Sequence, residues 1–237
     1  MTGVLNLIDD LIARRRGRLA GALLLAGSAT FWASWALMPM PGTNDPRFIL
    51  EAVAAARTAV LASCILQLVS AAVWVAGLVL MPGPEQATGR LAWWLGAAML
   101  AAGMTASAAD AIYHLIAYEL THPDVTPAMA LAVMTRIQGP DLLLLLPGVG
   151  AFFLGLLLLA VAGVRTGLLP RRGPWLMAAA VPIGAARIAL PGIAAPRVAG
   201  LMALACLIAP AAWMGWRLTR GHGERDAWLW RAKSERR

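Results

Sequence analysis

Six long runs of apolar residues constrain what this chain can fold into. Hydrophobic residues make up 60% of the sequence. A helix of about 20 apolar residues crosses a hydrocarbon core of roughly 30 Å, and there it satisfies its own backbone hydrogen bonds. The runs occupy roughly residues 19–38, 52–81, 91–117, 141–164, 174–190 and 197–216. The sequence therefore predicts an all-α fold, a polytopic membrane bundle of six transmembrane helices.

Short segments at either end flank this transmembrane domain of residues 19–217. In residues 1–18, apolar residues at helical spacing surround Asp9 and Asp10, and four arginines follow. That pattern is typical of an amphipathic helix at a membrane surface, and we predict that it is not cleaved as a signal peptide. Residues 218–237 form a basic tail.

Lys and Arg are unevenly divided between the two sides of the predicted bundle. With a cytoplasmic N-terminus, fifteen of the twenty basic residues fall on the cytoplasmic side. Cytoplasmic loops carry such an excess, so we predict that both termini are cytoplasmic. The preference for Arg over Lys, with abundant Ala and Gly, points to a bacterial cytoplasmic (inner) membrane. Basic clusters beside spans face anionic lipid, so membrane lipids are expected partners and nucleic acid is not.

Ionisable residues in or near the spans gather at their outer ends. A charge at the centre of a span costs roughly 2.5–3.5 kcal/mol on insertion scales, and less near the interface, where long side chains reach water. Ionisable residues that gather on one side at membrane depth therefore call for a structural or functional explanation. Its members are Glu51, Arg57, Asp110, His114, Arg136, Asp141 and Arg187.

Two stripes of small and polar residues share this outer half. Asp110 and His114 are four residues apart, so they lie on one helix face, which continues backward through Ser107 and Gly103. The second predicted span carries a similar stripe through Ser63, Gln67, Ser70 and Trp74. We expect the two stripes to face each other or a shared interior.

Two interpretations of these charges stay open. In the first, the arginines reach outer headgroups or pair with acidic residues such as Asp110 and lock helices together. In the second, Asp110, His114 and Tyr113 line a polar pocket open to the outer face. The short apolar helix predicted over residues 128–137 would then lie over the mouth of that pocket.

The residue inventory excludes several classes of membrane protein. The only lysine, Lys233, lies in the tail, so no span supplies a Schiff-base lysine. Only His114 lies near membrane depth, whereas bis-histidine haem ligation needs two histidines. Cys64 and Cys206 form no CxxC pair. We therefore expect no cofactor and no metal site. The sequence does not decide the oligomeric state.

The segment between the fourth and fifth predicted spans carries a short motif. It reads Arg165, Thr166, Gly167, Leu168, Leu169, Pro170 and Arg171. This resembles the R-x-G-[VL]-L-P-R connection of small six-span bacterial integral membrane proteins of unknown function. The resemblance implies the six-span layout over about residues 19–217, and it implies no substrate and no catalytic residue.

Three hypotheses about function follow. The first is a membrane protein whose outer polar cluster is structural or binds a small partner or lipid headgroup. The second is a small membrane enzyme on a lipophilic terpenoid or prenyl substrate, with Asp110 as proton donor. The third is a proton-coupled carrier using Asp110 and His114. If the protein is an enzyme, the candidate catalytic residues are Asp110, His114 and Glu51. The candidate substrate-binding residues are Arg57, Arg187, Tyr113 and Trp74.

Overall fold

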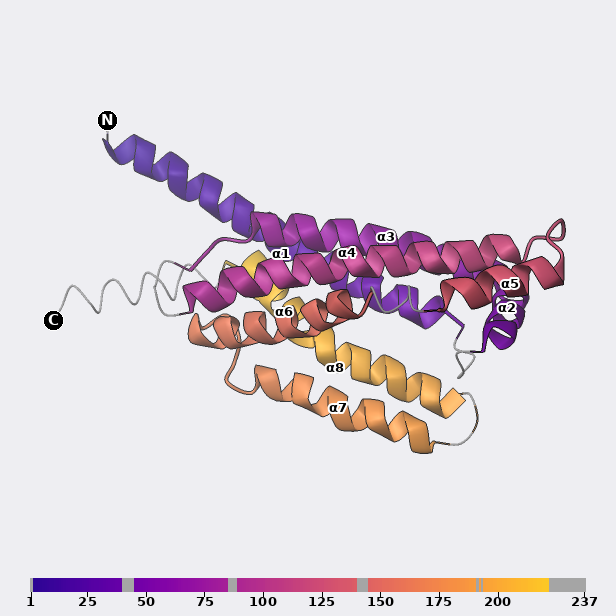
Figure 1. Cartoon of the computed structure of the whole chain (residues 1–237). Helices are drawn as coiled ribbons and strands as arrows, with labels where there is room; N and C mark the ends of the chain where they lie inside the picture. Colours follow the sequence, from indigo (N-terminus) through magenta and orange to yellow (C-terminus); the bar gives the residue numbers. More distant parts are fainter. Residues whose placement is uncertain are drawn as a thin grey trace.

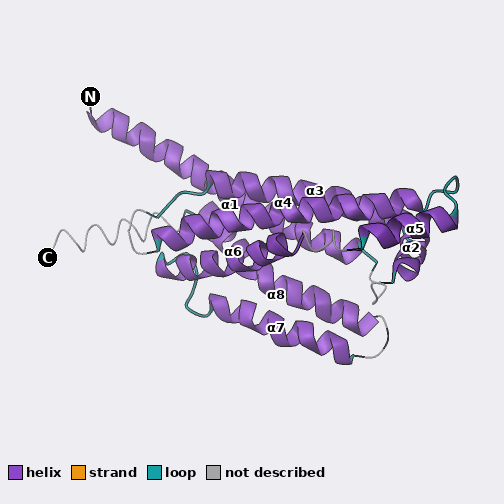
Figure 2. Cartoon of the chain, in the orientation of Figure 1, coloured by secondary structure: helices purple, strands orange, loops and turns teal. Residues whose placement is uncertain are grey.

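The computed structural model describes residues 2–39, 45–84, 89–139, 145–190, 192 and 194–221, with the backbone alone at 2–10, 187 and 188. Over these residues every regular element is a helix (Figure 2). The bounds are α1 (Thr2–Leu37), α2 (Pro46–Ala55), α3 (Arg57–Leu80), α4 (Arg90–Leu120), α5 (Pro127–Ile137), α6 (Leu146–Arg165), α7 (Gly173–Ala189) and α8 (Ala194–Thr219).

Five of the described helices are long and apolar enough to cross a membrane. They are α1 from Leu11 onward, α3, α4, α6 and α8. Helix α7 is apolar but shorter, at 17 residues. The all-helical prediction is confirmed, and the sixth span and the orientation stay predictions.

The helix boundaries differ from the sequence expectation in two places. Helix α1 is continuous, with no break between the segments predicted at 1–18 and 19–38. The predicted second span is two helices, because Ala56 leaves helical geometry at φ −130° and ψ 31° and separates α2 from α3. The predicted start of the fourth span at Asp141 lies outside the described residues.

Helix α1 packs on α3 and on α8, and it passes behind α3 and α4 in the view of Figure 1. Helix α4 packs on α3 and on α6, and α7 packs on α8. The main core joins the middle of these helices through large buried side chains, among them Phe31, Trp74, Leu100, Phe152 and Met214. A smaller core joins the end of α1 to α2, α3, α4 and α5, and it consists of Met38, Val53, Val60, Cys64, Ala117 and Met134. Gln67 of α3 and Asp110 of α4 lie between these two cores.

Close contact between α4 and α6 depends on glycines contributed by both helices. A Cβ at Gly103 of α4 would lie 2.5 Å from the Cα of Phe152, and one at Gly155 of α6 would meet the backbone of Leu100. Small residues let membrane helices approach this closely. The Gly103 position of the stripe on α4 is therefore used for packing against α6.

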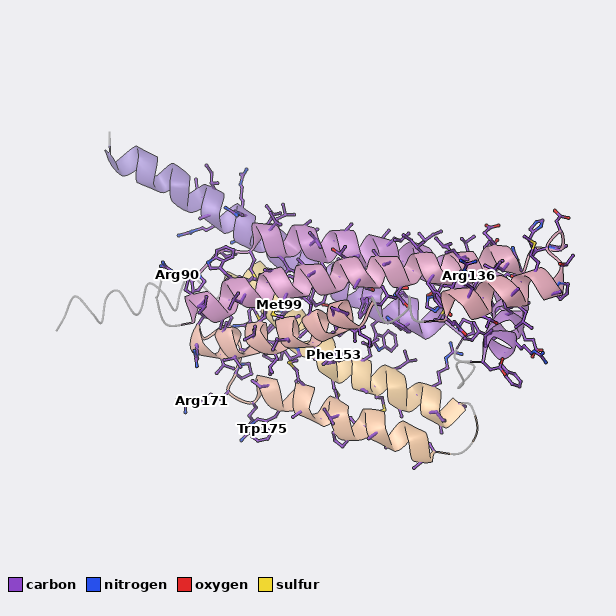
Figure 3. All side chains as sticks on the ribbon, in the orientation of Figure 1. Arg90, Met99, Arg136, Phe153, Arg171 and Trp175 are labelled. Atoms are coloured by element: carbon purple, nitrogen blue, oxygen red, sulfur yellow. The ribbon has the colours of Figure 1, made fainter. Side chains whose placement is uncertain are left out.

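The two ends of the bundle differ in charge. The ends of α3, α6 and α8 and the starts of α4 and α7 meet at one end, which we call the basic end. Figure 3 shows Arg90 and Arg171 there, and Arg136 at the opposite end, beside α2 and α5. The basic end carries Arg14, Arg15, Arg16, Arg18, Arg90, Arg165, Arg171, Arg172, Arg217 and Arg220. The helix packing thus collects at one end the arginines that the sequence assigns to one side.

Candidate functional site

The polar stripes of α3 and α4 meet through one amide side chain. Gln67 of α3 donates from Nε2 to the Asp110 carboxylate, with 3.1 Å between Nε2 and Oδ2. The same nitrogen lies 3.2 Å from the Ser107 hydroxyl oxygen. Gln67 is buried at 1% exposure, whereas the Asp110 side chain is 28% exposed. The expectation that the stripes face each other is confirmed, with Gln67 holding Asp110 in place.

His114 lies one turn beyond Asp110 on the same face of α4. Its Nδ1 is 2.9 Å from the backbone oxygen of Asp110 and 3.5 Å from Oδ2 of the carboxylate. A carbonyl oxygen only accepts, so Nδ1 carries the hydrogen in this contact. In the neutral ring, Nε2 is then an acceptor, and no described residue donates to it. The side chain of His114 is 17% exposed, so neighbouring residues cover most of it.

Two aromatic rings flank the imidazole. Tyr113 lies at 5.2 Å between ring centroids and Trp35 of α1 at 6.5 Å, both edge-on to His114. The hydroxyl of Tyr113 accepts a 2.7 Å hydrogen bond from Gln138, the residue that follows α5. The cluster therefore combines a carboxylate, an imidazole and aromatic faces from α1 and α4, with α5 linked to its edge. We call Gln67, Asp110, Tyr113, His114 and Trp35 the Asp110 cluster.

Arg57, one of the arginines near the predicted outer face, does not neutralise Asp110. Arg57 donates from Nη1 to the backbone oxygen of Tyr118, at 2.8 Å, and to the hydroxyl of Thr121. Its guanidinium also lies 4.0 Å from the centroid of the Tyr118 ring. Arg57 therefore caps the C-terminal end of α4, where free carbonyls and the helix dipole favour a cation. The hypothesis that Arg57 pairs with Asp110 is wrong for this reason.

Arginines also donate to backbone carbonyls at two other helix ends. Arg197 of α8 donates to the backbone oxygen of Ala36, in the last turn of α1. Arg16 of α1 donates to the backbone oxygens of Val79 and Leu80, each at 3.1 Å, at the end of α3. These arginines bind carbonyls of a neighbouring helix, so their positions near the helix ends have a structural explanation.

The other candidate site residues lie apart from the Asp110 cluster. Glu51 is exposed on α2, and the described side chains that contact the Asp110 carboxylate are Gln67 and His114 instead. Trp74 is fully buried, two turns along α3 from Gln67, and its ring packs against Gly27 of α1. Its indole nitrogen has no hydrogen-bond partner within the described ranges. The side chain of Arg187 lies outside the described residues.

Two apolar hollows in the described surface lie away from the Asp110 cluster. One of about 540 Å³ is formed by α7 and α8 and includes Ile183, Val198 and Met202. Another of about 360 Å³ is formed by α1 and α8 and includes Leu25, Trp32 and Ile208. Neither is lined by Asp110 or His114. No group of three or more His, Cys, Asp or Glu residues that could hold a metal ion occurs over the described part of the chain.

Sequence reasoning found Asp110 and His114 but not all of their partners. Gln67 was recognised as part of a stripe, and its role as the donor to Asp110 required the register between α3 and α4. Gln138 gave no signal, because its position after a short helix does not predict a contact with Tyr113. No protein-family model, curated protein or solved structure matches the chain.

Proposed function

We propose that this is a six-span protein of a bacterial inner membrane, with both termini cytoplasmic, whose Asp110 cluster binds the ammonium group of a small ligand from the outer side. The ligand that such a membrane offers in quantity is an amine-bearing lipid headgroup, as in phosphatidylethanolamine. The site would hold this headgroup against α4, near the outer surface of the bilayer. This proposal develops the first hypothesis drawn from the sequence, in which the outer polar cluster binds a lipid headgroup.

The proposal rests on the groups that surround the Asp110 carboxylate. It accepts from a neutral amide, lies near an imidazole, and has no arginine or lysine within ion-pair distance among the described residues. A carboxylate at membrane depth needs a partner, and its 28% exposure leaves room for one. An ammonium group supplies both the positive charge and the hydrogen-bond donors that the carboxylate lacks.

The aromatic rings support the same class of ligand. A cation near the face of an aromatic ring gains about 0.5–2 kcal/mol, with the larger values for desolvated sites. The rings of Trp35 and Tyr113 both lie beside His114, and Tyr113 and His114 are within about one turn of Asp110 on α4.

The proposed orientation is testable by labelling single cysteines. Each variant would carry one cysteine in a background with Cys64→Ser and Cys206→Ser. A membrane-impermeant maleimide added to intact cells should label Asp124→Cys, between α4 and α5, and should label Arg171→Cys, between α6 and α7, only after permeabilisation. Both parent residues are exposed, so access to the reagent depends on the side of the membrane. Labelling of Arg171→Cys in intact cells would contradict the cytoplasmic assignment.

Ligand binding is tested by replacing the carboxylate with its neutral isostere. We expect phosphatidylethanolamine to raise the melting temperature of the detergent-solubilised protein more than phosphatidylglycerol does. Asp110→Asn should weaken the apparent affinity for phosphatidylethanolamine about 10- to 100-fold, since hydrogen bonds to a charged group contribute roughly 1.5–3 kcal/mol.

Asp124→Asn is the matched control for this measurement. Asp124 is a carboxylate beyond the end of α4 whose side chain is 88% exposed, so its loss should leave lipid affinity unchanged. Equal affinities for phosphatidylethanolamine in the original protein and in Asp110→Asn would exclude the ammonium site.

A second function, proton exchange in an enzyme or a carrier, is favoured by Nε2 of His114, to which no described residue donates a hydrogen bond. The two functions differ in the expected effect of His114→Asn. Asparagine keeps a donor near the position of Nδ1 but has no nitrogen that exchanges a proton near neutral pH. Headgroup binding should then persist within a few-fold, whereas substrate turnover or proton-coupled uptake should be abolished.

A further inference from the structure

The imidazole of His114 is placed so that its own charge alters the charge balance of the Asp110 cluster. Histidine is the side chain that ordinarily gains or loses a proton between about pH 5 and pH 8. Nδ1 of His114 lies 3.5 Å from Oδ2 of Asp110, which is within ion-pair distance. When the imidazole is neutral, its contact and that of Gln67 leave the charge of the carboxylate uncompensated. When the imidazole carries a proton on both nitrogens, it supplies the positive charge itself.

The second proton would be added at Nε2 of His114. Nδ1 already carries a hydrogen, which it donates to the backbone oxygen of Asp110 at 2.9 Å. Within the described ranges Nε2 has no hydrogen-bond partner, so protonation there breaks no bond between described residues. The contact of Nδ1 with the backbone therefore holds the imidazole beside the carboxylate in both of its charge states.

The other side chains packed on the cluster keep their charge over this pH range. Tyr113 of α4 and Cys64 of α3 both sense the charge of Asp110. A phenol and a thiol are ordinarily neutral below about pH 8. The indole of Trp35 and the amide of Gln67 do not ionise in this range. The contacts that surround the carboxylate thus contain one group that titrates between about pH 5 and pH 8, the imidazole.

Charged side chains elsewhere at this end of the bundle do not alter the balance with pH. Arg57 binds the end of α4 and Arg197 binds the end of α1, and arginine stays cationic. Three further charged residues from the helices around the cluster are exposed, namely Glu51 of α2, Glu119 of α4 and Arg136 of α5. Neither a carboxylate in water nor a guanidinium changes charge between about pH 5 and pH 8.

We infer that protonation of His114 turns off the ammonium site at acidic pH, an inference that rests on the proposed function of the Asp110 cluster. The imidazolium and the ammonium group of the ligand are two cations that need the same carboxylate. Each therefore weakens the binding of the other, and the two effects are equal in size. Binding is strong where the imidazole is neutral and is lost as the pH falls. The proton changes the charge of the site and is not passed to a substrate, which separates this switch from proton exchange in an enzyme or a carrier.

The switch is tested by the apparent affinity for phosphatidylethanolamine at two pH values in detergent. The original protein should bind about 10-fold more weakly at about pH 5 than at about pH 8, a coupling of the size usual between two binding sites. His114→Asn should bind at the higher pH within a few-fold of the original protein and should lose this pH dependence. His114→Gln replaces it if asparagine is not tolerated.

His122→Asn is the matched control for the removal of an imidazole. His122 is half exposed in the loop after α4, where its Nδ1 lies 3.2 Å from Oδ2 of Asp124. This histidine also titrates near neutral pH, but it has no contact with the Asp110 carboxylate among those that the structure describes. His122→Asn should therefore keep the full pH dependence of the original protein.

A measurement on the unaltered protein tests the same competition without any variant. Binding of phosphatidylethanolamine at about pH 6 should release protons, and titration calorimetry in two buffers of different ionisation enthalpy detects that release. Equal affinity at both pH values, or binding without proton release, would overturn the switch and leave the ammonium site in place. Full pH dependence in His114→Asn would also overturn it, because another group would then be titrating. No binding at either pH would remove the proposed function and the switch together.

Discussion

Replacing Gly103 by alanine should lower the free energy of unfolding by about 1–3 kcal/mol, the usual cost of forcing extra atoms into a packed interior. The added Cβ would lie 2.5–2.6 Å from the Cα, Cβ and nitrogen of Phe152. Two of these atoms are backbone, so no rotamer change relieves the contact, and α4 and α6 must move apart. That movement would also loosen the Asp110 cluster, which lies about two turns further along α4.

Gly150→Ala is the matched control for Gly103→Ala. Gly150 lies in α6, and a Cβ there would meet no atom within 4 Å. Alanine has the higher helix propensity, by up to about 1 kcal/mol, so this variant should be neutral or more stable. The measurement is the loss of monodisperse protein on heating in detergent, followed by size-exclusion chromatography. Equal behaviour of the two variants would show that the α4–α6 contact is looser than the structure has it.

Arg57→Met should be the second strongly destabilising substitution, with an expected loss of about 2–3 kcal/mol. Methionine keeps an apolar stem of similar length but removes the hydrogen bonds to Tyr118 and Thr121 at the end of α4. Hydrogen bonds to charged groups contribute roughly 1.5–3 kcal/mol, and the stacking on Tyr118 adds about 0.5–1 kcal/mol. Arg57→Lys should recover only part of the loss, because lysine has no planar guanidinium.

Arg136→Met controls for the removal of a positive charge at the same end of the bundle. Arg136 is exposed in the last turn of α5, so its substitution should change stability by less than about 0.5 kcal/mol. The same heating assay compares both variants. If Arg57→Met were as stable as Arg136→Met, the capping role of Arg57 would be wrong, and a headgroup contact would be its better explanation.

Several features of the fold are readable from composition and spacing. The positions of α4 and α8 follow from runs of apolar residues, and the i, i+4 spacing of Asp110 and His114 places them on one face. The break at Ala56 is not readable, because alanine is a good helix former and nothing in the local sequence ends a helix there. The continuity of α1 through the arginine cluster was missed for a related reason, since arginine favours helix as well.

The arginines show most clearly what the sequence leaves open. Arg57 belongs to the charges that the sequence places near one end of the bundle, and the sequence alone offers headgroups or carboxylates as partners for it and for Arg197. The structure gives them backbone carbonyls of neighbouring helices instead. A carbonyl at a helix end is the same group in every sequence, so no residue pattern reveals which helix end lies within reach of an arginine.

The sequence by itself determined a helical chain of membrane-spanning length, the uneven distribution of its arginines, and the shared face of Asp110 and His114. These follow from local quantities, namely apolar run length, charge position and the 3.6-residue period. Only the tertiary structure decided that Gln67 binds Asp110, that Trp35 from α1 stands beside His114, and that the arginines cap helix ends. Those contacts depend on the register and rotation of one helix against another, which the glycine contacts and the buried side chains set together.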